Sequence, residues 1–333
     1  MIIYLIRRFF LMIPTLLGIT IVSFGIIQTA PGGPVEQAIQ NIQMGGGGSG
    51  SGVSQEVIDA LNKQYGRDKP IHERYFIWLK NIVRLDFGDS FKYEEPVTKV
   101  IISKFPVSLT FGLVTFILTY LICIPLGVLK AIRNGSAFDR VSSFILFLFY
   151  SIPPVMLGIL LLVFFASTTY FDWFPIGGMT SDNYSELSAF GQIKDRIHHM
   201  ILPLICYVIG SFTFLTLLMK NTMLDVVRLD YVRTAQAKGL SSKVVYMKHA
   251  LRNALIPIVT GMSGILTVFF TGSILIETVF NLDGMGLLSY QSVLSRDYNV
   301  LMGLIFFQSL LFLLGRLLTD VLYVIVDPRI DFT

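Results

Sequence analysis

The few residues that could do chemistry in this chain do not form a catalytic set. His198 and His199 are adjacent, so their side chains would diverge on a helix, and a metal site needs more ligands than these two. Cys123 and Cys206 both lie inside apolar runs, which is typical of small buried hydrophobic residues. The sequence contains no G-x-x-x-x-G-K-[ST] motif, so it has no phosphate-binding loop of that kind for ATP. We therefore expect a protein that is not an enzyme and that carries no cofactor of its own.

A polar and basic segment, Tyr231–Pro257, indicates a different kind of chemistry, the binding of a partner. It lies between two long apolar runs, and Gly239 suits a turn between two short helices. Its apolar residues recur at a spacing of three or four, which is one face of a helix. They are Leu240, Val244, Met247, Leu251 and Leu255. The pattern fits either an amphipathic helix on a membrane surface or a pair of helices that docks a protein.

The composition indicates that lipid is the main solvent of this chain. Hydrophobic residues make up 53% of its 333 residues, and charged residues only 14%. Soluble domains carry about 25% charged residues. The net charge of +4 is too small to predict binding to nucleic acid.

Six apolar segments are long enough to cross a bilayer as helices, because a hydrocarbon core of ~30 Å needs about 20 residues. They are Phe9–Thr29, Pro106–Leu129, Val141–Phe171, Met200–Met219, Asn253–Ile276 and Tyr298–Val326. The third is too long for one straight span, and Pro153-Pro154 predicts a kink inside it. In the sixth, Arg316 and Asp320 have the spacing of a structural ion pair. We expect an all-α polytopic integral membrane protein.

The charges predict that both termini lie in the cytoplasm. The short loops on that side hold most of the Lys and Arg residues, as the positive-inside rule requires. The first apolar segment is longer than a signal-peptide core, so we expect a retained anchor. Residues 1–29 then form the cytoplasmic start and first span, and 30–105 an extracytoplasmic loop. Residues 106–333 form a core of five helices with a cytoplasmic loop at 221–252.

Two helices are predicted in the extracytoplasmic loop. One begins near Ser54 and stops near Gly66, and the other carries an apolar face from Ile71 to Ile82. Residues 45–52 are all Gly or Ser and predict a flexible linker. The sequence leaves open whether this linker is natural or replaces a longer loop.

The basic segment resembles the EAA loop of permease subunits of ATP-binding-cassette importers. When Gly239 is aligned with the glycine of that motif, Ala235 and Leu251 match it, but its other fixed positions fall on residues of different type. The aligned residues are Arg233, Thr234 and Ala235 for E-A-A, His249 for the apolar residue, and Leu251 and Arg252 for Leu-Pro. The stretch TAQAKG…HALRNALIP is much more similar to TARAKG…HALRNALIP, which is typical of the dipeptide, oligopeptide and nickel branch.

The resemblance extends over nearly the whole chain. It includes IRRFFLMIPTLLGITIVSF with the following PGGP, RYFIWLKNIVRLDFGDS, FPVSLTFGL and VDPRIDF. It also includes ETVFNLDGMGLL, which fits the branch pattern E-x-V-F-x-x-x-G-x-G-x-L. Three further stretches, PGGPVEQAIQ, KPIHERYF and FTGSILIE, are most similar to the peptide and microcin C importers within this branch.

This resemblance implies a type I importer permease fold with six transmembrane helices in a bacterial inner membrane. It implies a second permease subunit in a heterodimer, an extracytoplasmic solute-binding protein, and a cytoplasmic ATPase that holds ATP and Mg²⁺. The implied substrates are peptides, with peptide–nucleotide antibiotics such as microcin C as a narrower expectation. The ATPase would dock on the basic segment. The residues expected there are Arg233, Thr234, Ala235, Ala237, Lys238, Gly239, Lys243, Lys248, His249 and Arg252.

A pathway for peptides should be wet and lined by groups that form hydrogen bonds. The candidates are Ser211, Thr213, Thr216, Ser263, Thr267, Thr271 and Ser273, although Ser and Thr also often bond to their own helix or join helices. Glu277 and Asp283 are expected at the outer mouth or in contact with the binding protein. The alternative is a stand-alone secondary transporter or channel. That class favours more intramembrane charges or two matching halves, and the sequence shows one charged pair and no clear repeat.

Overall fold

The computed structural model describes residues 2–29, 55–64, 68–261 and 272–326, with residues 32, 33, 35, 36, 39, 42 and 270. Over this part of the chain the regular structure is helical, apart from one isolated bridge between Asp89 and Pro96. The chain forms two compact units. The first comprises Met1–Arg8, Val107–Leu287 and Leu311–Thr333, and the second comprises Phe9–Pro106 and Leu288–Leu310.

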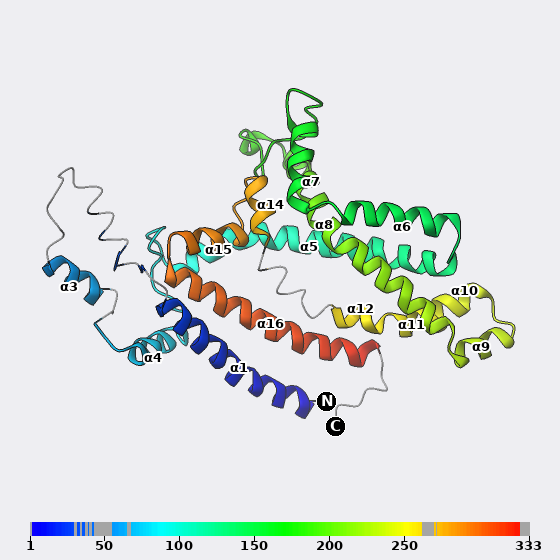
Figure 1. The fold of residues 1–333 in the computed structure, drawn as a ribbon, viewed down its shortest axis with the longest axis horizontal. Helices are drawn as coiled ribbons and strands as arrows, with labels where there is room; N and C mark the ends of the chain where they lie inside the picture. Colours follow the sequence, from blue (N-terminus) through cyan, green and yellow to red (C-terminus); the bar gives the residue numbers. More distant parts are fainter. Residues whose placement is uncertain are drawn as a thin grey trace. The chain divides into compact units, whose positions relative to one another are not determined.

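Four helices of the described residues are long and apolar enough to cross a membrane. They are α1 (Ile2–Thr29), α5 (Val97–Ile132), α8 (Ala189–Val227) and α16 (Tyr298–Val326). The pair of α6 (Ala137–Tyr150) and the helical stretch Pro154–Ala166, which begins with α7 (Pro154–Leu161), passes the same test of length and composition when taken together, and its two halves are bent by 89° (Figure 1). The remaining predicted span, Asn253–Ile276, falls partly outside the described residues.

The bend between α6 and α7 confirms the kink that the two prolines predicted. Pro154 has no N–H to donate and stands at the start of α7, while Pro153 holds an extended conformation before it. The break is therefore complete, and each half is a separate helix. After Leu161 the chain continues as a short π-helix, η1 (Leu162–Ala166).

Helices α5 and α8 extend well beyond the apolar segments that predicted them. With its 39 residues, α8 is about 58 Å long, nearly twice the ~30 Å of a hydrocarbon core. Hydropathy marks only the part of a helix that needs lipid, so the polar ends of α8 could not be predicted from it. The two helices pack closely, since a Cβ atom on Gly127 of α5 would lie 2.6 Å from Cβ of Met219 on α8.

Two hydrophobic cores hold the first unit together. One joins α5, α7 and α8 to α14 (Ile274–Val279). It is built from Phe111, Leu157, Cys206, Ile276, Phe280 and Leu282. The other joins α5 and α8 to the helices that follow α8. It is built from Cys123, Val128, Leu215, Met219, Met223, Ala250, Ala254 and Ile258. Both cysteines are free and buried, which confirms the prediction of small buried hydrophobic residues.

The second unit contains both helices predicted for the extracytoplasmic loop, α3 (Gln55–Gln64) and α4 (Ile71–Ile82). The apolar face of α4 packs on α1, where the rings of Tyr75 and Trp78 contact Phe24. The hydroxyl groups of Tyr75 and Thr20 are hydrogen-bonded at 3.0 Å. The amphipathic helix predicted here is therefore confirmed.

The stretch RLDFGDS is fixed to the start of α16 in the same unit. Asp297 is buried, and its Oδ2 accepts hydrogen bonds from the hydroxyl of Ser90 at 2.5 Å and the backbone N–H of Lys92 at 3.1 Å. Phe87 packs against Phe306 and Phe307 of α16. The segment α15 (Met285–Leu294) leads into this contact.

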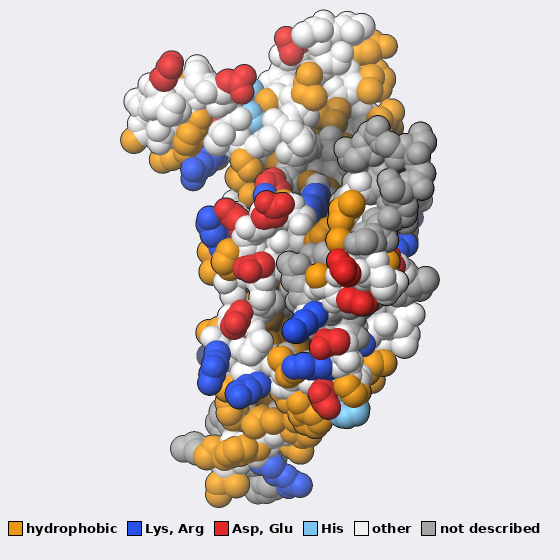
Figure 2. All heavy atoms as spheres, turned by 90° about the vertical axis from the view of Figure 1, so that its left-hand side faces the viewer, with side chains coloured by type: hydrophobic (Ala, Val, Ile, Leu, Met, Phe, Trp, Pro, Cys, Tyr) orange, Lys and Arg blue, Asp and Glu red, His pale blue; other side chains and the backbone are white. Residues whose placement is uncertain are grey.

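On the face seen in Figure 2, basic and acidic side chains are interspersed, in keeping with the small net charge.

The prediction of an Arg316–Asp320 ion pair is wrong in this structure. Asp320 pairs instead with Arg8 of α1, and Tyr4 accepts a hydrogen bond from the same arginine. The guanidinium of Arg316 lies over the ring of Phe312, 5.2 Å from its centroid. Asp320 is nearly buried, so it takes the partner that the packing of α1 on α16 supplies and not the exposed arginine one turn away.

Replacing Gly127 by Val should destabilise the contact between α5 and α8. The added side chain would collide with Met219 and the carbonyl of Thr216, and such overpacking costs about 1–3 kcal/mol. The thermal unfolding midpoint of the purified protein in detergent should fall. Gly210→Val on α8 is the control, because a Cβ atom there meets nothing within 4 Å. Equal effects of both substitutions would contradict the close packing.

Candidate functional site

The predicted docking segment forms a compact series of short helices after α8. They are α9 (Asp230–Ala237), α10 (Ser242–Val244), the π-helix η3 (Val245–Ala250), α11 (Leu251–Ala254) and α12 (Ile256–Gly261). We call residues 229–254 the basic bend. Figure 1 shows α9 and α10 beyond the C-terminal end of α8. Gly239 has a φ of +77° and forms the turn between α9 and α10, as predicted.

Small apolar side chains anchor the basic bend. Val232, Ala235 and Val245 form a buried cluster against Val226 at the end of α8. Ala250 and Ala254 are completely buried and belong to the core around Met219 and Met223. Because these side chains have few rotamers and no exposed surface, the bend is held tightly against α8.

Hydrogen bonds close the bend on itself. The hydroxyl of Tyr231 on α9 donates to the backbone carbonyl of His249 at 3.2 Å. The side-chain amide of Asn253 donates to the same hydroxyl at 2.8 Å. These contacts join α9 to η3 and α11, so the two arms on either side of Gly239 form one body.

Most of the predicted docking residues are exposed. They are Arg233, Thr234, Ala237, Lys238, Gly239, Lys243, Lys248 and Arg252, and His249 is half-buried. Ala235 differs: it is one of the residues predicted to dock the ATPase, but its side chain is buried in the anchoring cluster. Arg233 lies 3.9 Å from Asp230, one turn earlier on α9.

The predicted apolar face of the bend divides into two parts. Leu240, Val244 and Met247 are exposed, with 42%, 38% and 51% of their surface accessible. Leu251 and Leu255 are half-buried and pack on the core at the end of α8. Met247 lies within the π-helix η3 and Leu251 directly follows it, and the wider turn of this helix shifts the register of the side chains. The exposed part therefore forms a separate apolar patch among lysines.

Glu277 lies in a second site of unusual construction. Its side chain is fully buried, and it accepts hydrogen bonds from the hydroxyl of Ser108 at 3.2 Å and that of Tyr207 at 3.4 Å. The backbone N–H of Leu287 donates to Oε2 at 2.7 Å, and that of Ser273 donates to Oε1 at 3.1 Å. Burial raises the pKa of the Glu277 carboxyl above its ordinary value, and the two N–H groups act in the opposite direction.

Two glycines make room for this carboxylate, and a third lets the backbone of the loop pack closely. A Cβ atom on Gly272 or Gly284 would come within 3 Å of the Glu277 carboxylate, and one on Gly286 within 3 Å of backbone atoms of Ser273. The pattern E-x-V-F-x-x-x-G-x-G-x-L is therefore a structural unit in which Glu277 holds the loop that follows α14. We expected Glu277 to shape an outer mouth or touch a binding protein, but it points inward. Asp283 in the same loop is exposed.

The predicted pathway residues occupy different environments. Ser211 is exposed and donates to the carbonyl of Val208. Thr213 is buried and donates to the carbonyl of Leu146 on α6 at 3.0 Å, so it joins two helices. Thr216 is fully buried near Cys123, and Ser273 precedes α14. Ser263, Thr267 and Thr271 lie outside the described residues. The pathway assignment stays a prediction.

Sequence reasoning missed a buried ionic cluster of Lys130, Asp139 and Lys220, which joins α5, α6 and α8. It also missed Ser108 and Tyr207 as partners of Glu277. The sequence carries only a weak signal for Asp139. Ser136 stands three residues before it, as a residue at the start of a helix does, and the N–H of Asp139 donates to the Ser136 hydroxyl. Nothing in the local sequence pointed to the lysines.

Comparisons with known proteins give a consistent result over the full length of the chain. Residues 123–332 match the family described as binding-protein-dependent transport system inner membrane component. Residues 1–112 match the N-terminal family of the membrane components of the same systems.

Several relatives are similar over nearly all of both chains. The inner membrane ABC transporter permease protein YejB of Escherichia coli O157:H7 is 44% identical over 358 residues, covering 99% of this chain and 98% of the relative. The peptidoglycan transport system permease protein YejB of Agrobacterium fabrum is 43% identical, with coverage of 99% and 98%. The oligopeptide transport system permease protein AppB of Bacillus subtilis is 38% identical, with coverage of 99% of each.

Replacing Glu277 by Ala should loosen the loop after α14. The hydroxyl of Ser108 and the N–H groups of Ser273 and Leu287 would lose an acceptor, at a cost of roughly 2–4 kcal/mol. Limited proteolysis of the detergent-purified protein should cut this loop faster, and its unfolding midpoint should fall. Asp182→Ala, at an exposed acid elsewhere in the first unit, should change neither. A loop equally resistant in both variants would refute the role of Glu277.

Proposed function

This chain belongs to the family of inner membrane components of binding-protein-dependent transport systems, and from this premise we propose how it works. It is a multi-pass permease subunit of an ABC importer for peptides and forms half of the pathway through the membrane. The basic bend docks a separate ATPase, which supplies the energy. The names of the relatives, which include a peptidoglycan and an oligopeptide transport system, support this substrate class.

The docking proposal rests on which side chains the basic bend exposes. It presents an apolar patch of Leu240, Val244 and Met247 beside Lys243 and Lys248, on a body fixed to α8. Such a surface fits a groove with an apolar floor and an acidic rim. The lysines would guide the encounter, and the apolar side chains would supply most of the affinity.

A helix lying on the membrane surface fits this geometry less well. Membrane-surface helices are usually continuous, with one long apolar face. Here the helix α10 has three residues, the turn at Gly239 interrupts the segment, and η3 divides the apolar face. The broken shape suits insertion into a shaped partner and favours docking over the membrane alternative.

The proposed assembly has four kinds of component. The chain pairs with a second permease subunit as a heterodimer, and an extracytoplasmic solute-binding protein delivers the peptide. ATP and Mg²⁺ are bound by the ATPase alone. Both termini and the basic bend lie on the cytoplasmic side, as the distribution of Lys and Arg predicts.

Reconstitution tests this function directly. The chain should co-purify with an ABC ATPase when it is isolated from its own cells, and liposomes that contain the complex should take up oligopeptides only with ATP and the binding protein. A parallel assay with a peptide–nucleotide antibiotic of the microcin C type tests the narrower cargo. Uptake by the chain alone, driven by an ion gradient without ATP, would show that the rival secondary-transporter function is correct.

Gly239→Val should weaken the attachment of the ATPase. A β-branched residue at a φ of +77° is strained by about 1–2 kcal/mol or more, so the turn would relax and displace α10. ATP-dependent uptake should fall while the chain still inserts in the membrane. Gly239→Asn is the matched control, because Asn tolerates this conformation. Equal uptake by the two variants would show that the turn is not required.

The lysines of the bend should control the affinity for the ATPase. The double variant Lys243→Glu/Lys248→Glu should weaken binding by about tenfold at low salt, and the difference should shrink as the ionic strength rises. Pull-down of the purified ATPase over a salt series measures this. Lys194→Glu, an exposed lysine near the other end of α8, should bind normally. A salt-independent difference would argue against charge complementarity.

A further inference from the structure

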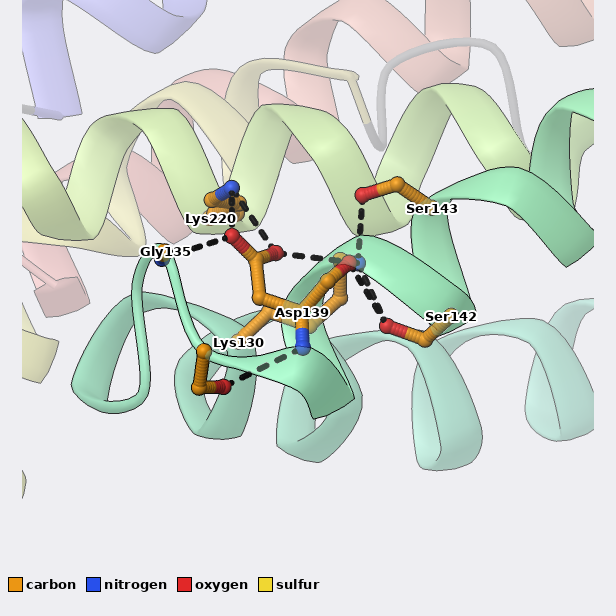
Figure 3. A network of polar contacts seen from close by, with 7 residues as sticks. Lys130, Gly135, Asp139, Ser142, Ser143 and Lys220 are labelled. Carbon is orange, nitrogen blue, oxygen red and sulfur yellow. Dashed lines mark hydrogen bonds and ion pairs between the residues drawn. The ribbon is translucent and has the colours of Figure 1, made fainter.

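One buried carboxylate joins three membrane helices at the end of α8 that carries the basic bend. Figure 3 shows Asp139, in the first turn of α6, between Lys220 of α8 and Lys130 of α5. The ammonium of Lys220 donates to both carboxylate oxygens, at 2.8 and 2.7 Å. Lys130 lies 3.2 Å from Oδ1 and donates to the backbone carbonyl of Asp139 at 3.0 Å.

The remaining polar groups of the cluster are satisfied as well. Lys130 is fully buried and donates to the hydroxyls of Ser142 and Ser143, at 2.6 and 2.8 Å. The backbone N–H of Gly135, in the connection between α5 and α6, donates to Oδ2 of Asp139 at 3.1 Å. A buried network in which each charge has partners fixes one arrangement of its helices.

The cluster and the basic bend are attached to the same helix. Lys220 precedes the end of α8 by seven residues, about 10 Å along the helix axis. Its neighbour Met219 lies in the core that holds Ala250 and Ala254 of the bend. A displacement of the bend would therefore reach α8 first and the cluster next.

We propose that Lys130, Asp139 and Lys220 are positioning residues for import: they make the α5–α6 hairpin follow α8 when the ATPase moves the bend. This rests on the proposed docking of the ATPase. Without the cluster, α8 would move and the hairpin would lag, so ATP hydrolysis would continue while the pathway failed to open. None of the three residues needs to touch the peptide.

A purely stabilising role explains the cluster less well. In a buried ion pair the electrostatic attraction offsets little more than the free energy lost when the charges leave water. Apolar side chains of similar volume usually stabilise a fold as well or better. A charged network holds helices in a defined orientation more strictly than apolar contacts, which can slide. That property is useful where motion must pass from one helix to two others.

The test uses the complete complex in liposomes and the variant Lys220→Met. The Lys130–Asp139 pair stays intact in this variant, so no buried charge loses all its partners. The number of peptides imported per ATP hydrolysed should fall about tenfold, within the range expected for coupling between two sites. Lys220→Arg should restore the ratio. Lys194→Met, the same change at an exposed position of α8, should leave it unchanged.

Distances between spin labels test the mechanical step separately. Phe144 of α6 and Phe214 of α8 are both exposed and accept labels after replacement by Cys. In the otherwise unchanged complex, with the two native cysteines replaced by Ala, their separation should be the same with and without ATP. In Lys220→Met it should change with ATP, because the two helices no longer move together.

The outcomes separate the two proposals. If the unmodified chain fails to bind the ATPase, the docking proposal fails, and this inference fails with it. If the ATPase binds but Lys220→Met imports as many peptides per ATP as the unmodified chain, only the inference is overturned. A proportional loss of hydrolysis and uptake, with a lower unfolding midpoint, would also overturn it by showing a stabilising role alone.

Discussion

The basic bend depends on its close packing against the end of α8. Val232, Ala235 and Val245 on one side, and Ala250 and Ala254 on the other, leave almost no surface exposed. A polar segment between two apolar runs could otherwise move independently of them, and a partner that bound it would displace only the segment itself. Because the anchoring side chains are small and tightly packed, force applied to the exposed patch acts on α8. The rest of the proposed mechanism requires this contact.

Two buried carboxylates stabilise the first unit, and they do so by different chemistry. Glu277 is surrounded by neutral donors, two hydroxyls and two backbone N–H groups, and it fixes a loop. Asp139 is surrounded by two ammonium groups and fixes three helices. Away from water each buried polar group needs partners within the protein. The places where the chain turns between apolar helices are therefore the places where such networks form.

Much of the fold could be predicted from the sequence because its signals are local. Long apolar runs predicted membrane-spanning helices, and Pro153 and Pro154 predicted the break between α6 and α7. Gly239 predicted the turn in the basic bend. The periodic apolar residues of α4 gave a helix with one packed face. Each of these signals arises from the conformational limits of one residue or from a spacing of three or four. The ends of α5 and α8 were missed, since nothing in hydropathy marks where a helix stops once it has left the lipid.

The sequence alone determined that this is a helical membrane protein with a basic segment that turns at Gly239, because hydropathy and turn conformation depend on residues that are close together in the chain. Only the tertiary structure decided which side chains that segment presents and which charges meet. Lys220 is 81 residues from Asp139, Ser108 is 169 from Glu277, and Arg8 is 312 from Asp320. Such pairs follow from how helices pack, so Asp320 took Arg8 in place of Arg316, and Ala235 and Glu277 turned inward. Helix packing depends on how well whole helix surfaces fit each other, so the spacing of residues within one segment does not predict it.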